Sequence, residues 1–383
     1  MNIVVRTYAG FEEILKQEIE KITNSSITIQ KRAVTLEGDM KDIYKINIWS
    51  RLAIDVLVEI SNFRVFNEKQ LYSNVYKINW PKYMGINDTF SVSSIVYSRF
   101  FSHSKYVALK TKDAIADCFR DKYSIRPNVE RNNPDFNFVI KISEKDASVL
   151  WNTSGNALFK RGYRKENVLA PLNEILAAGI LKLISWDKKT PLIDPMCGGG
   201  TFLCEAAMIS SNFAPGLLRK KFGFEKSNFF KEKEFQDVVN LAKAKFNPSN
   251  CCNLYGYDID KEAISISKNN LNNISSELKV DFLEKDFFIL DKQIENGILL
   301  FNPPYDQRIQ KDDIIAFYND IGSRLKHFWE NYEAWIISAN LKALKRIGLK
   351  PKKKITLFNG PLECRLANFP LYKGSSREKL LKQ

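Results

Sequence analysis

Apolar and polar positions along residues 1–155 alternate with two periods. A two-residue period predicts strands, and apolar residues three or four positions apart predict helices. Strands are expected at Asn2–Arg6, Ala33–Leu36, Ile54–Phe63, Thr89–Val96, Phe136–Ser143 and Ala147–Asn152, and helices at Phe11–Ile22, Met40–Leu52, Leu71–Val75 and Ser102–Phe119. The last two strands are close enough in the chain to form a hairpin. This mixture is typical of small α+β units.

The pattern changes after about residue 167, where helices and strands alternate regularly. Helices are expected at Pro171–Ile184, Thr201–Ser211, Lys261–Leu271 and Ile314–Trp329, and strands at Pro191–Asp194, Leu254–Asp258, Val280–Glu284, Gly297–Asn302 and Ala334–Ser338. Such alternation predicts an α/β domain with a mostly parallel, doubly wound, Rossmann-like sheet. We therefore expect α+β domains at 1–53 and 54–155, a linker at 156–166 and the α/β domain at 167–383.

A glycine-rich turn, DPMCGGGT at 194–201, follows the first strand of the α/β domain. Glycines at a strand-to-helix turn let the backbone approach a ligand closely, and open α/β sheets bind ligands at the carboxyl ends of their strands. The phosphate-loop pattern GxxxxGK[ST] does not occur, which disfavours ATP, and the dinucleotide pattern GxGxxG is not met either. Many ligand sites use such a turn, so it does not identify the ligand.

Acidic residues follow the next two strands. Asp258, in YGYDID at 255–260, has oxygens that can accept hydrogen bonds from both ribose hydroxyls of an adenosyl group, with Ile259 packing on the adenine. Asp286, in EKDFF at 284–288, could accept from the adenine amino group. The structural alternative for such an aspartate is a helix N-cap, and Asp260 fits that role better than Asp258.

The motif NPPY at 302–305 follows the fourth strand. Its two prolines, Pro303 and Pro304, stiffen the turn and have no backbone N–H, so nearby carbonyl oxygens stay free to accept. The Asn302 side-chain oxygen and the Pro303 carbonyl can then hold an exocyclic amino group by its two N–H bonds. Tyr305 offers a face on which a base can stack. The motif suits methyl transfer to an aromatic amine, with positioning supplying most of the rate.

Positive charge is concentrated near the C-terminal end. The 383 residues carry 58 Lys and Arg against 44 Asp and Glu, and residues 341–383 hold 12 and 2 of these. A basic patch is the usual footprint of a polyanion partner, chiefly nucleic acid. The candidates for RNA contact are Lys352, Lys353 and Lys354, with a second cluster in the linker at Lys160, Arg161, Arg164 and Lys165. A solvated, solubilising tail is the alternative.

Cysteine and histidine usage argues against several classes of protein. The six cysteines are scattered without a CxxC pair, which indicates reduced thiols rather than a disulfide framework or a zinc site. The two histidines, His103 and His327, are the only imidazoles available for Ser-His-Asp chemistry. We expect no signal peptide, and no apolar run approaches the ~18–20 residues that span a bilayer. The expectation is a cytoplasmic protein without bound metal or membrane contact.

Taken in order, these motifs resemble a known family. DPMCGGGT, YGYDID, EKDFF and NPPY are similar to the motifs of class I S-adenosylmethionine-dependent methyltransferases that modify base amino groups. Two segments, LFKRGYRKENVLAPLNEILAAGIL at 158–181 and FNGPLECRLANFPLY at 358–372, resemble more specifically the THUMP-domain RNA methyltransferases related to the RlmL-type 23S rRNA guanine-N2 methyltransferase. The resemblance covers essentially the whole chain. It implies that 1–53 is a ferredoxin-like domain and 54–155 a THUMP domain, both recognising structured RNA.

The resemblance also implies roles for single residues. The cofactor is expected to be S-adenosylmethionine (SAM), with S-adenosylhomocysteine (SAH) as product. The expected cofactor set is Ala170, Pro171, Leu172, Asp194, Met196, Cys197, Gly198, Gly200, Thr201, Asp258, Ile259, Asp286, Phe287 and Asn302, and the expected base set is Asn302, Pro303, Pro304 and Tyr305.

Two features depart from the family pattern. NPPYDQR replaces the commoner NPPYGER, and residues 212–250 insert a basic, Phe-rich stretch. That insertion either contacts RNA or packs against the core through Phe222, Phe224, Phe229 and Phe230, and packing is the favoured interpretation.

The expected function is formation of N2-methylguanosine in structured RNA, either 23S rRNA or a ribosome assembly intermediate. Three alternatives stay open: the same reaction on tRNA, adenine-N6 methylation of RNA or DNA, and a non-catalytic RNA-binding assembly factor. The RNA-binding resemblance of the N-terminal half weighs against DNA. The intact Asp194, Gly198, Asp258 and Asn302 weigh against a non-catalytic role. A nicotinamide-dependent oxidoreductase is disfavoured because its reaction has no need of NPPY.

Overall fold

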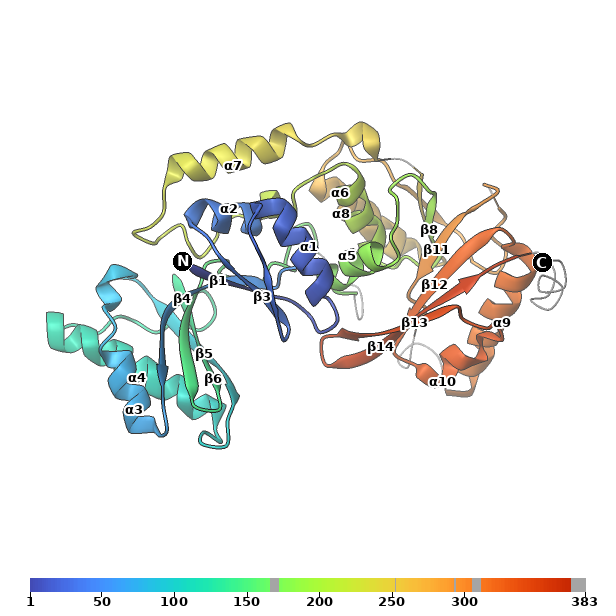
Figure 1. Cartoon of the computed structure of the whole chain (residues 1–383). Coiled ribbons are helices and arrows are strands. Elements are labelled where there is room, and N and C mark those ends of the chain that lie inside the picture. The colour runs from blue at the N-terminus through green and yellow to red at the C-terminus, as the bar shows by residue number, and fades with distance from the viewer. Residues whose placement is uncertain (166–171, 252, 293, 305–310, 373–383) are drawn as a thin grey trace. The chain divides into compact units, whose positions relative to one another are not determined.

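The structure is a computed structural model that describes residues 1–165, 172–251, 253–292, 294–304 and 311–372. The chain divides into two compact units. The first contains Met1–Lys160 and Arg219–Ala242, and the second contains Arg161–Leu218 and Lys243–Gln383. The described part of each unit is built round a seven-stranded sheet (Figure 1).

The first unit contains the α+β elements expected from the sequence. Its strands are β1 (Asn2–Arg6), β2 (Thr28–Gln30), β3 (Ala33–Glu37), β4 (Asp55–Arg64), β5 (Phe90–Tyr97), β6 (Phe136–Ser143) and β7 (Asp146–Asn152). Its helices are α1 (Glu12–Thr23), α2 (Met40–Trp49), α3 (Glu68–Tyr76), α4 (Ser104–Tyr123) and most of α7 (Glu232–Ala244). The short β2 and the helix α7 were not predicted.

One continuous sheet runs through this unit, in the order β2-β3-β1-β4-β7-β6-β5. The long strand β4 joins its two halves, because β4 pairs with β1 through residues 55–58 and with β7 along nearly its whole length. The pairing of β5 with β6 is parallel, and the others are antiparallel. The parts expected as two N-terminal domains therefore share one sheet.

The inserted segment packs onto this first unit through a cluster of aromatic rings. Phe222 and Phe224 are buried, and the Tyr44 ring from α2 lies 4.9 Å from the Phe224 ring and 5.5 Å from the Phe235 ring, centroid to centroid. The half-buried Phe230 contacts the same cluster. The favoured interpretation, that the phenylalanines of the insertion serve packing, agrees with this arrangement.

Backbone contacts at the start of the insertion fix it further. The Arg219 guanidinium donates hydrogen bonds to four carbonyl oxygens, those of Ser154, Asn156, Ala157 and Lys160. Gly223 lies so close to the chain that a Cβ there would come within 2.7 Å of the Asn152 oxygen and of the Gly155 nitrogen. Arg219 thus holds residues 156–160, the first part of the segment expected as a linker.

The second unit has the predicted α/β architecture. Its strands are β8 (Leu192–Asp194), β9 (Leu254–Asp258), β10 (Asp281–Glu284), β11 (Gly297–Phe301), β12 (Tyr332–Ser338), β13 (Lys353–Asn359) and β14 (Leu362–Pro370). Its helices are α5 (Glu174–Leu183), α6 (Thr201–Ser210), α8 (Lys261–Ile274), α9 (Lys311–Phe328) and α10 (Leu341–Leu344). The order is β10-β9-β8-β11-β12-β14-β13. The strands from β10 to β12 are parallel, which confirms the mostly parallel sheet, whereas the antiparallel β13–β14 hairpin was not predicted.

Helices cover both faces of this sheet, with α5, α6 and α8 on one side and α9 and α10 on the other (Figure 1). Under α9, Leu299, Phe301 and Ile336 of the strands form a core with Tyr318 and Ile321 of the helix, all with no exposed surface. Strand order reverses between β8 and β11, so the loops on either side separate there. Open α/β sheets bind their ligands at such a switch point, outside the carboxyl ends of the strands.

Candidate cofactor and base site

The four sequence motifs meet at one edge of the second sheet. Asp194, Asp258, Glu284 and Phe301 are the last residues of β8, β9, β10 and β11, which are neighbouring parallel strands. Because parallel strands place their carboxyl ends at the same edge, residues that follow them in the chain come together. The site is therefore a product of topology, although its parts are more than a hundred residues apart in sequence.

The turn after β8 is tightly constrained. Gly198 and Gly200 have φ values of +51° and +72°, a backbone conformation that residues with a side chain rarely adopt. The buried Asp194 accepts the Met196 N–H at 3.3 Å, and burial raises the pKa of its carboxyl well above the ordinary value. Cys197 is also buried, and burial raises the pKa of its thiol. These groups shape the turn, and their contact with a cofactor stays a prediction.

A row of polar side chains on α8 holds the turn in place. Ser267 donates to the Gly198 carbonyl at 2.6 Å, Asn270 donates to the Gly199 carbonyl at 2.9 Å, and Asn273 donates to the Tyr163 carbonyl at 2.9 Å. Residues three apart lie on the same helix face, so one face of α8 secures two turn carbonyls and the chain before α5. These three residues were not predicted, although their three-residue spacing in a helix was a usable signal.

Backbone N–H groups hold both carboxylate oxygens of Asp258. One carboxylate oxygen accepts the Gly198 N–H at 2.8 Å and the other accepts the Asp260 N–H at 3.0 Å. A carboxylate oxygen has room for a second donor, so each oxygen can also take one ribose hydroxyl. Asp260 caps α8 by accepting the Glu262 N–H at 2.8 Å, which confirms the N-cap interpretation for Asp260.

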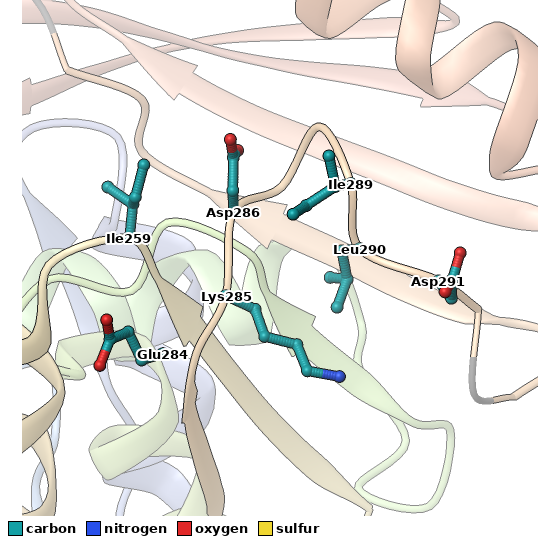
Figure 2. A pocket seen from close by; sticks show the side chains of 7 residues that line it. All are labelled: Ile259, Glu284, Lys285, Asp286, Ile289, Leu290 and Asp291. Carbon is teal, nitrogen blue, oxygen red and sulfur yellow. The ribbon is translucent and has the colours of Figure 1, made fainter.

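A cavity of about 310 Å³ lies beside Asp258, at the ends of β9 and β10. It is lined by Ile259, Glu284, Lys285, Asp286, Ile289, Leu290 and Asp291. Figure 2 shows the Ile259 and Asp286 side chains pointing to the same side of these loops, and the Ile289 side chain turned toward Asp286. Ile259 is 71% exposed and Ile289 is 75% exposed, which is unusual for isoleucine and leaves two apolar surfaces open beside one carboxylate. An adenine ring requires such apolar faces together with an acceptor for its amino group.

The structure changes the prediction for Phe287. Its side chain is buried, stacks on the Trp329 ring at 6.3 Å between centroids, and contacts Phe301 in the core beneath α9. It therefore cannot offer its ring to a cofactor. Ile289, two residues further on, is the apolar side chain of this loop that is exposed at the cavity. The run of apolar residues in DFFIL does not reveal which side chain faces outward, and a contact of the Phe287 backbone with a cofactor stays a prediction.

The described part of NPPY follows β11 directly. Asn302 and Pro304 are half-buried and Pro303 is buried. Tyr305 lies outside the described residues, as do Ala170 and Pro171.

Leu172 is buried, and its carbonyl accepts from Arg164 at 3.3 Å. Thr201, at the start of α6, accepts from Arg164 at 2.8 Å through its hydroxyl oxygen. Met196 is half-buried and packs against the core under α9.

Two of the residues assigned to RNA form ion pairs with buried glutamates. Arg161 is 2% exposed, and its guanidinium pairs with the fully buried Glu205 of α6 at 3.3 Å and 3.4 Å. Arg164 pairs with the buried Glu174 of α5 at 3.2 Å. The RNA prediction is wrong for Arg161, which has no surface to offer. Arg164 is committed to Glu174, Thr201 and the Leu172 carbonyl, so it ties the turn after β8 to the start of α5.

The remaining basic candidates are exposed. Lys160 and Lys165 lie at the surface on either side of this buried pair in sequence. Lys352, Lys353 and Lys354 are exposed at the start of β13, which is the edge strand of the second sheet. Lysines on an edge strand also prevent pairing with strands of other molecules. Their binding to RNA stays a prediction.

The described residues fit an adenosyl cofactor and offer no metal site. Asp258 has acceptor capacity for two hydroxyls, and two exposed isoleucines flank Asp286 at the cavity. Within the described ranges, no group of three or more His, Cys, Asp and Glu side chains is arranged to hold a metal ion. Every helix in the same ranges is too short or too polar to cross a membrane.

Replacing Asp258 by alanine is expected to weaken SAM binding about a hundredfold, because two hydrogen bonds to a charged acceptor are lost. Titration calorimetry of the purified variant with SAM measures this. Asp260→Ala is the matched control. It removes a neighbouring carboxylate whose oxygen accepts the Glu262 N–H at the start of α8 and is not assigned to the ribose. Equal SAM affinity in Asp258→Ala and the unmodified protein would contradict the ribose assignment.

Three known protein families match successive parts of the chain. The description "RMKL-like, methyltransferase domain" matches residues 161–368, "THUMP domain" matches residues 66–151 and "RlmL ferredoxin-like domain" matches residues 2–57. These matches confirm the resemblance seen in the sequence motifs.

Individual relatives cover most of the chain. The ribosomal RNA large subunit methyltransferase K/L of Buchnera aphidicola subsp. Schizaphis graminum is 35% identical over 374 residues, which is 96% of this chain and 54% of that protein. A Synechocystis sp. protein, provisionally named as an RNA methyltransferase, is 32% identical over 95% of each chain. This chain thus spans about half the length of the K/L relative and nearly all of the Synechocystis one.

One solved structure adds a bound product. SMU.472, a methyltransferase candidate complexed with SAH, has a TM-score of 0.85 and 28% sequence identity over 98% of this chain and 99% of that chain. The domain order, the sheet topology and the relatives agree with one another. The chain belongs to the RMKL-like methyltransferase family, with ferredoxin-like and THUMP domains before its methyltransferase domain.

Proposed function

We propose that this protein transfers a methyl group from SAM to the exocyclic N2 amine of a guanosine in large-subunit ribosomal RNA. The observation that carries the proposal is the position of Asn302 and Pro303. They follow β11 at the same sheet edge where β8, β9 and β10 end in the adenosyl-type site. Two hydrogen-bond acceptors for an amine therefore lie next to a site that suits a methyl donor.

The chain contributes orientation to this reaction. SAM supplies a sulfonium-bound methyl group, which is transferred with SAH as product. The Asn302 side-chain oxygen and the Pro303 carbonyl accept the two N–H bonds of the amine, which aims the nitrogen lone pair along a fixed line. Holding two reactants in this way lowers the barrier without a strong base. The half-buried Asn302 is partly shielded from water that would compete for the same hydrogen bonds.

The target base must leave its stack before it can reach this edge. Extruding a nucleotide costs a few kcal/mol, and least where the base is already unpaired. Exposed Lys160, Lys165, Lys352, Lys353 and Lys354 are proposed to hold phosphates of the RNA during this step. The names of the K/L and Synechocystis relatives support RNA as the substrate, and the first of them supports large-subunit rRNA.

Nucleoside mass spectrometry tests the proposal. 23S rRNA and tRNA are purified separately from a strain that lacks the gene and from its parent. The expected result is loss of N2-methylguanosine from 23S rRNA, restored by the unmodified gene and not by Asn302→Ala.

Other outcomes reassign the substrate. Loss of a methylated guanosine from tRNA alone would support the same reaction with tRNA, not 23S rRNA, as the substrate. Loss of N6-methyladenosine would identify adenine, in place of guanine, as the target base. No change in any methylated nucleoside would contradict catalysis and favour an RNA-binding assembly role.

A further inference from the structure

Exposed aromatic side chains gather with cationic ones at one end of the first sheet. Phe66 follows β4, Tyr97 and Phe100 follow or end β5, and Lys145 lies in the turn between β6 and β7. Phe66 is 46% exposed, Tyr97 59% and Phe100 37%. Large aromatic surfaces are uncommon on a soluble protein unless they meet a partner. We call this set, with Arg99, the aromatic platform.

Cations and rings are interleaved in the platform. The Phe66 and Phe100 rings meet edge to face at 6.3 Å between centroids. The Lys145 ammonium lies 4.9 Å from the Phe66 centroid and 5.3 Å from the Phe100 centroid, and the Arg99 guanidinium lies 5.6 Å from the Phe100 centroid. Such contacts hold the cations beside the rings without neutralising their charge.

The platform rests on an ordered support. Val65 and Phe101, which adjoin the two exposed phenylalanines, are buried, and the Val65 N–H donates to the Lys145 carbonyl at 2.8 Å. Ser98 donates to the Glu144 carbonyl at 2.6 Å and accepts the Phe100 N–H at 3.0 Å. The rings are therefore presented by three connected segments.

The net positive charge of the platform segments favours an anionic partner. The three segments 64–69, 97–105 and 141–146 contain six Lys and Arg against three Asp and Glu. Glu144 pairs with Arg99 at 3.3 Å and Asp146 pairs with Arg64 at 3.4 Å, so Lys145 is the cation that sits between the rings with no ion pair described for it. Aromatic faces next to a positive groove are the usual means of binding single-stranded nucleic acid, since every base has a face to stack.

We infer that the aromatic platform binds unpaired RNA by stacking bases on Phe66 and Phe100, while Lys145 and Arg99 attract the backbone. This inference rests on the proposed function, because it gives the RNA substrate a second contact within the part of the chain that matches a THUMP domain. It adds a location and a mode of binding, by base stacking and without base-edge reading. The platform should therefore tolerate different sequences and discriminate against duplexes.

Fluorescence anisotropy with the full chain tests it. The probes are a labelled 12-nucleotide oligouridine and a labelled RNA duplex, at one fixed ionic strength because nucleic-acid affinity depends on salt. Phe66→Ala/Phe100→Ala is expected to bind the oligouridine about thirtyfold more weakly, which corresponds to about 2 kcal/mol for two lost stacking faces. Duplex affinity should change much less. SAM affinity and the thermal unfolding midpoint are measured alongside to exclude misfolding.

Two further variants sharpen the test. Tyr123→Ala removes an exposed ring in the same unit that also has a lysine nearby, Lys122 at 5.4 Å, and it should bind oligouridine like the unmodified protein. Phe66→Leu/Phe100→Leu keeps apolar bulk and removes the aromatic face, and it should resemble the alanine variant.

Several results would overturn the inference. Leucine restoring full binding would indicate an apolar protein contact instead of stacking. Base stacking on the platform is also contradicted if the unmodified chain fails to bind oligouridine, or if the alanine variant binds it equally well. None of these outcomes bears on methyl transfer, which is followed separately by nucleoside analysis, so the inference and the proposed function can fail independently.

Discussion

Asn302→Ala is expected to lower the turnover number about a thousandfold, because one of the two acceptors that orient the amine is lost and a misplaced nucleophile reacts far more slowly. SAM affinity should be nearly unchanged, since the ribose and adenine contacts proposed for the cofactor lie at the ends of β9 and β10. Single-turnover methylation of an RNA substrate measures the first quantity, and calorimetry with SAM measures the second.

Two controls separate orientation from general damage. Asn302→Gln retains the amide and moves it outward by one methylene, so it should also be strongly impaired. Asn272→Ala removes an exposed amide on α8 and should retain full turnover. If Asn302→Ala lost SAM binding as severely as turnover, the contact of Asn302 with the cofactor would account for its role and the base assignment would be wrong.

Arg161→Met is expected to destabilise the protein by about 3–5 kcal/mol, the usual cost of leaving a buried charge without its partner. Glu205 has no exposed side-chain surface, and its two oxygens both face the Arg161 guanidinium. Removing the arginine leaves that carboxylate buried next to the buried Glu174, which aggravates the repulsion. Urea unfolding monitored by circular dichroism measures the loss.

A double replacement tests the cause. Arg161→Met/Glu205→Leu removes both charges and should recover most of the lost stability, because well-packed apolar groups can replace a buried ion pair at little cost. Lys160→Met, at the exposed neighbour, should leave the free energy of unfolding unchanged. An Arg161→Met variant that unfolds normally but binds RNA weakly would reinstate the surface role first expected from the sequence.

The sequence was most informative where a local rule applies. Strand and helix periods located nearly every element that bears on the site, and the carboxyl-end rule for parallel strands predicted that Asp194, Asp258 and Asn302 come together. The misses arose where tertiary packing decides. KRGYRK presents four cations in six residues, and nothing local indicates that Arg161 meets Glu205, forty-four positions away. Phe287 and Ile289 are likewise two apolar residues of one turn, and the local sequence does not indicate that Phe287 is buried while Ile289 is exposed.

The inserted segment shows the same limit on a larger scale. Its phenylalanines indicated packing, but their partner, Tyr44, lies far earlier in the chain. β13 and β14 were not predicted because neither follows a clean two-residue alternation. β13 is an exposed, lysine-rich strand at the sheet edge, whereas β14 lies between β12 and β13 and ends in a run of buried residues. Edge strands are shaped by the need to avoid further pairing as much as by burial.

The position of residues 219–242 has a consequence for synthesis on the ribosome. Met1–Lys160 is translated first, yet the rings that cover Tyr44 and the guanidinium that binds the carbonyls of residues 154–160 belong to a segment completed roughly eighty residues later. At ordinary elongation rates that delay is about 4–16 s. Throughout it, the nascent first unit exposes an unfinished aromatic surface, so we expect it to recruit chaperones until Ala242 has left the exit tunnel.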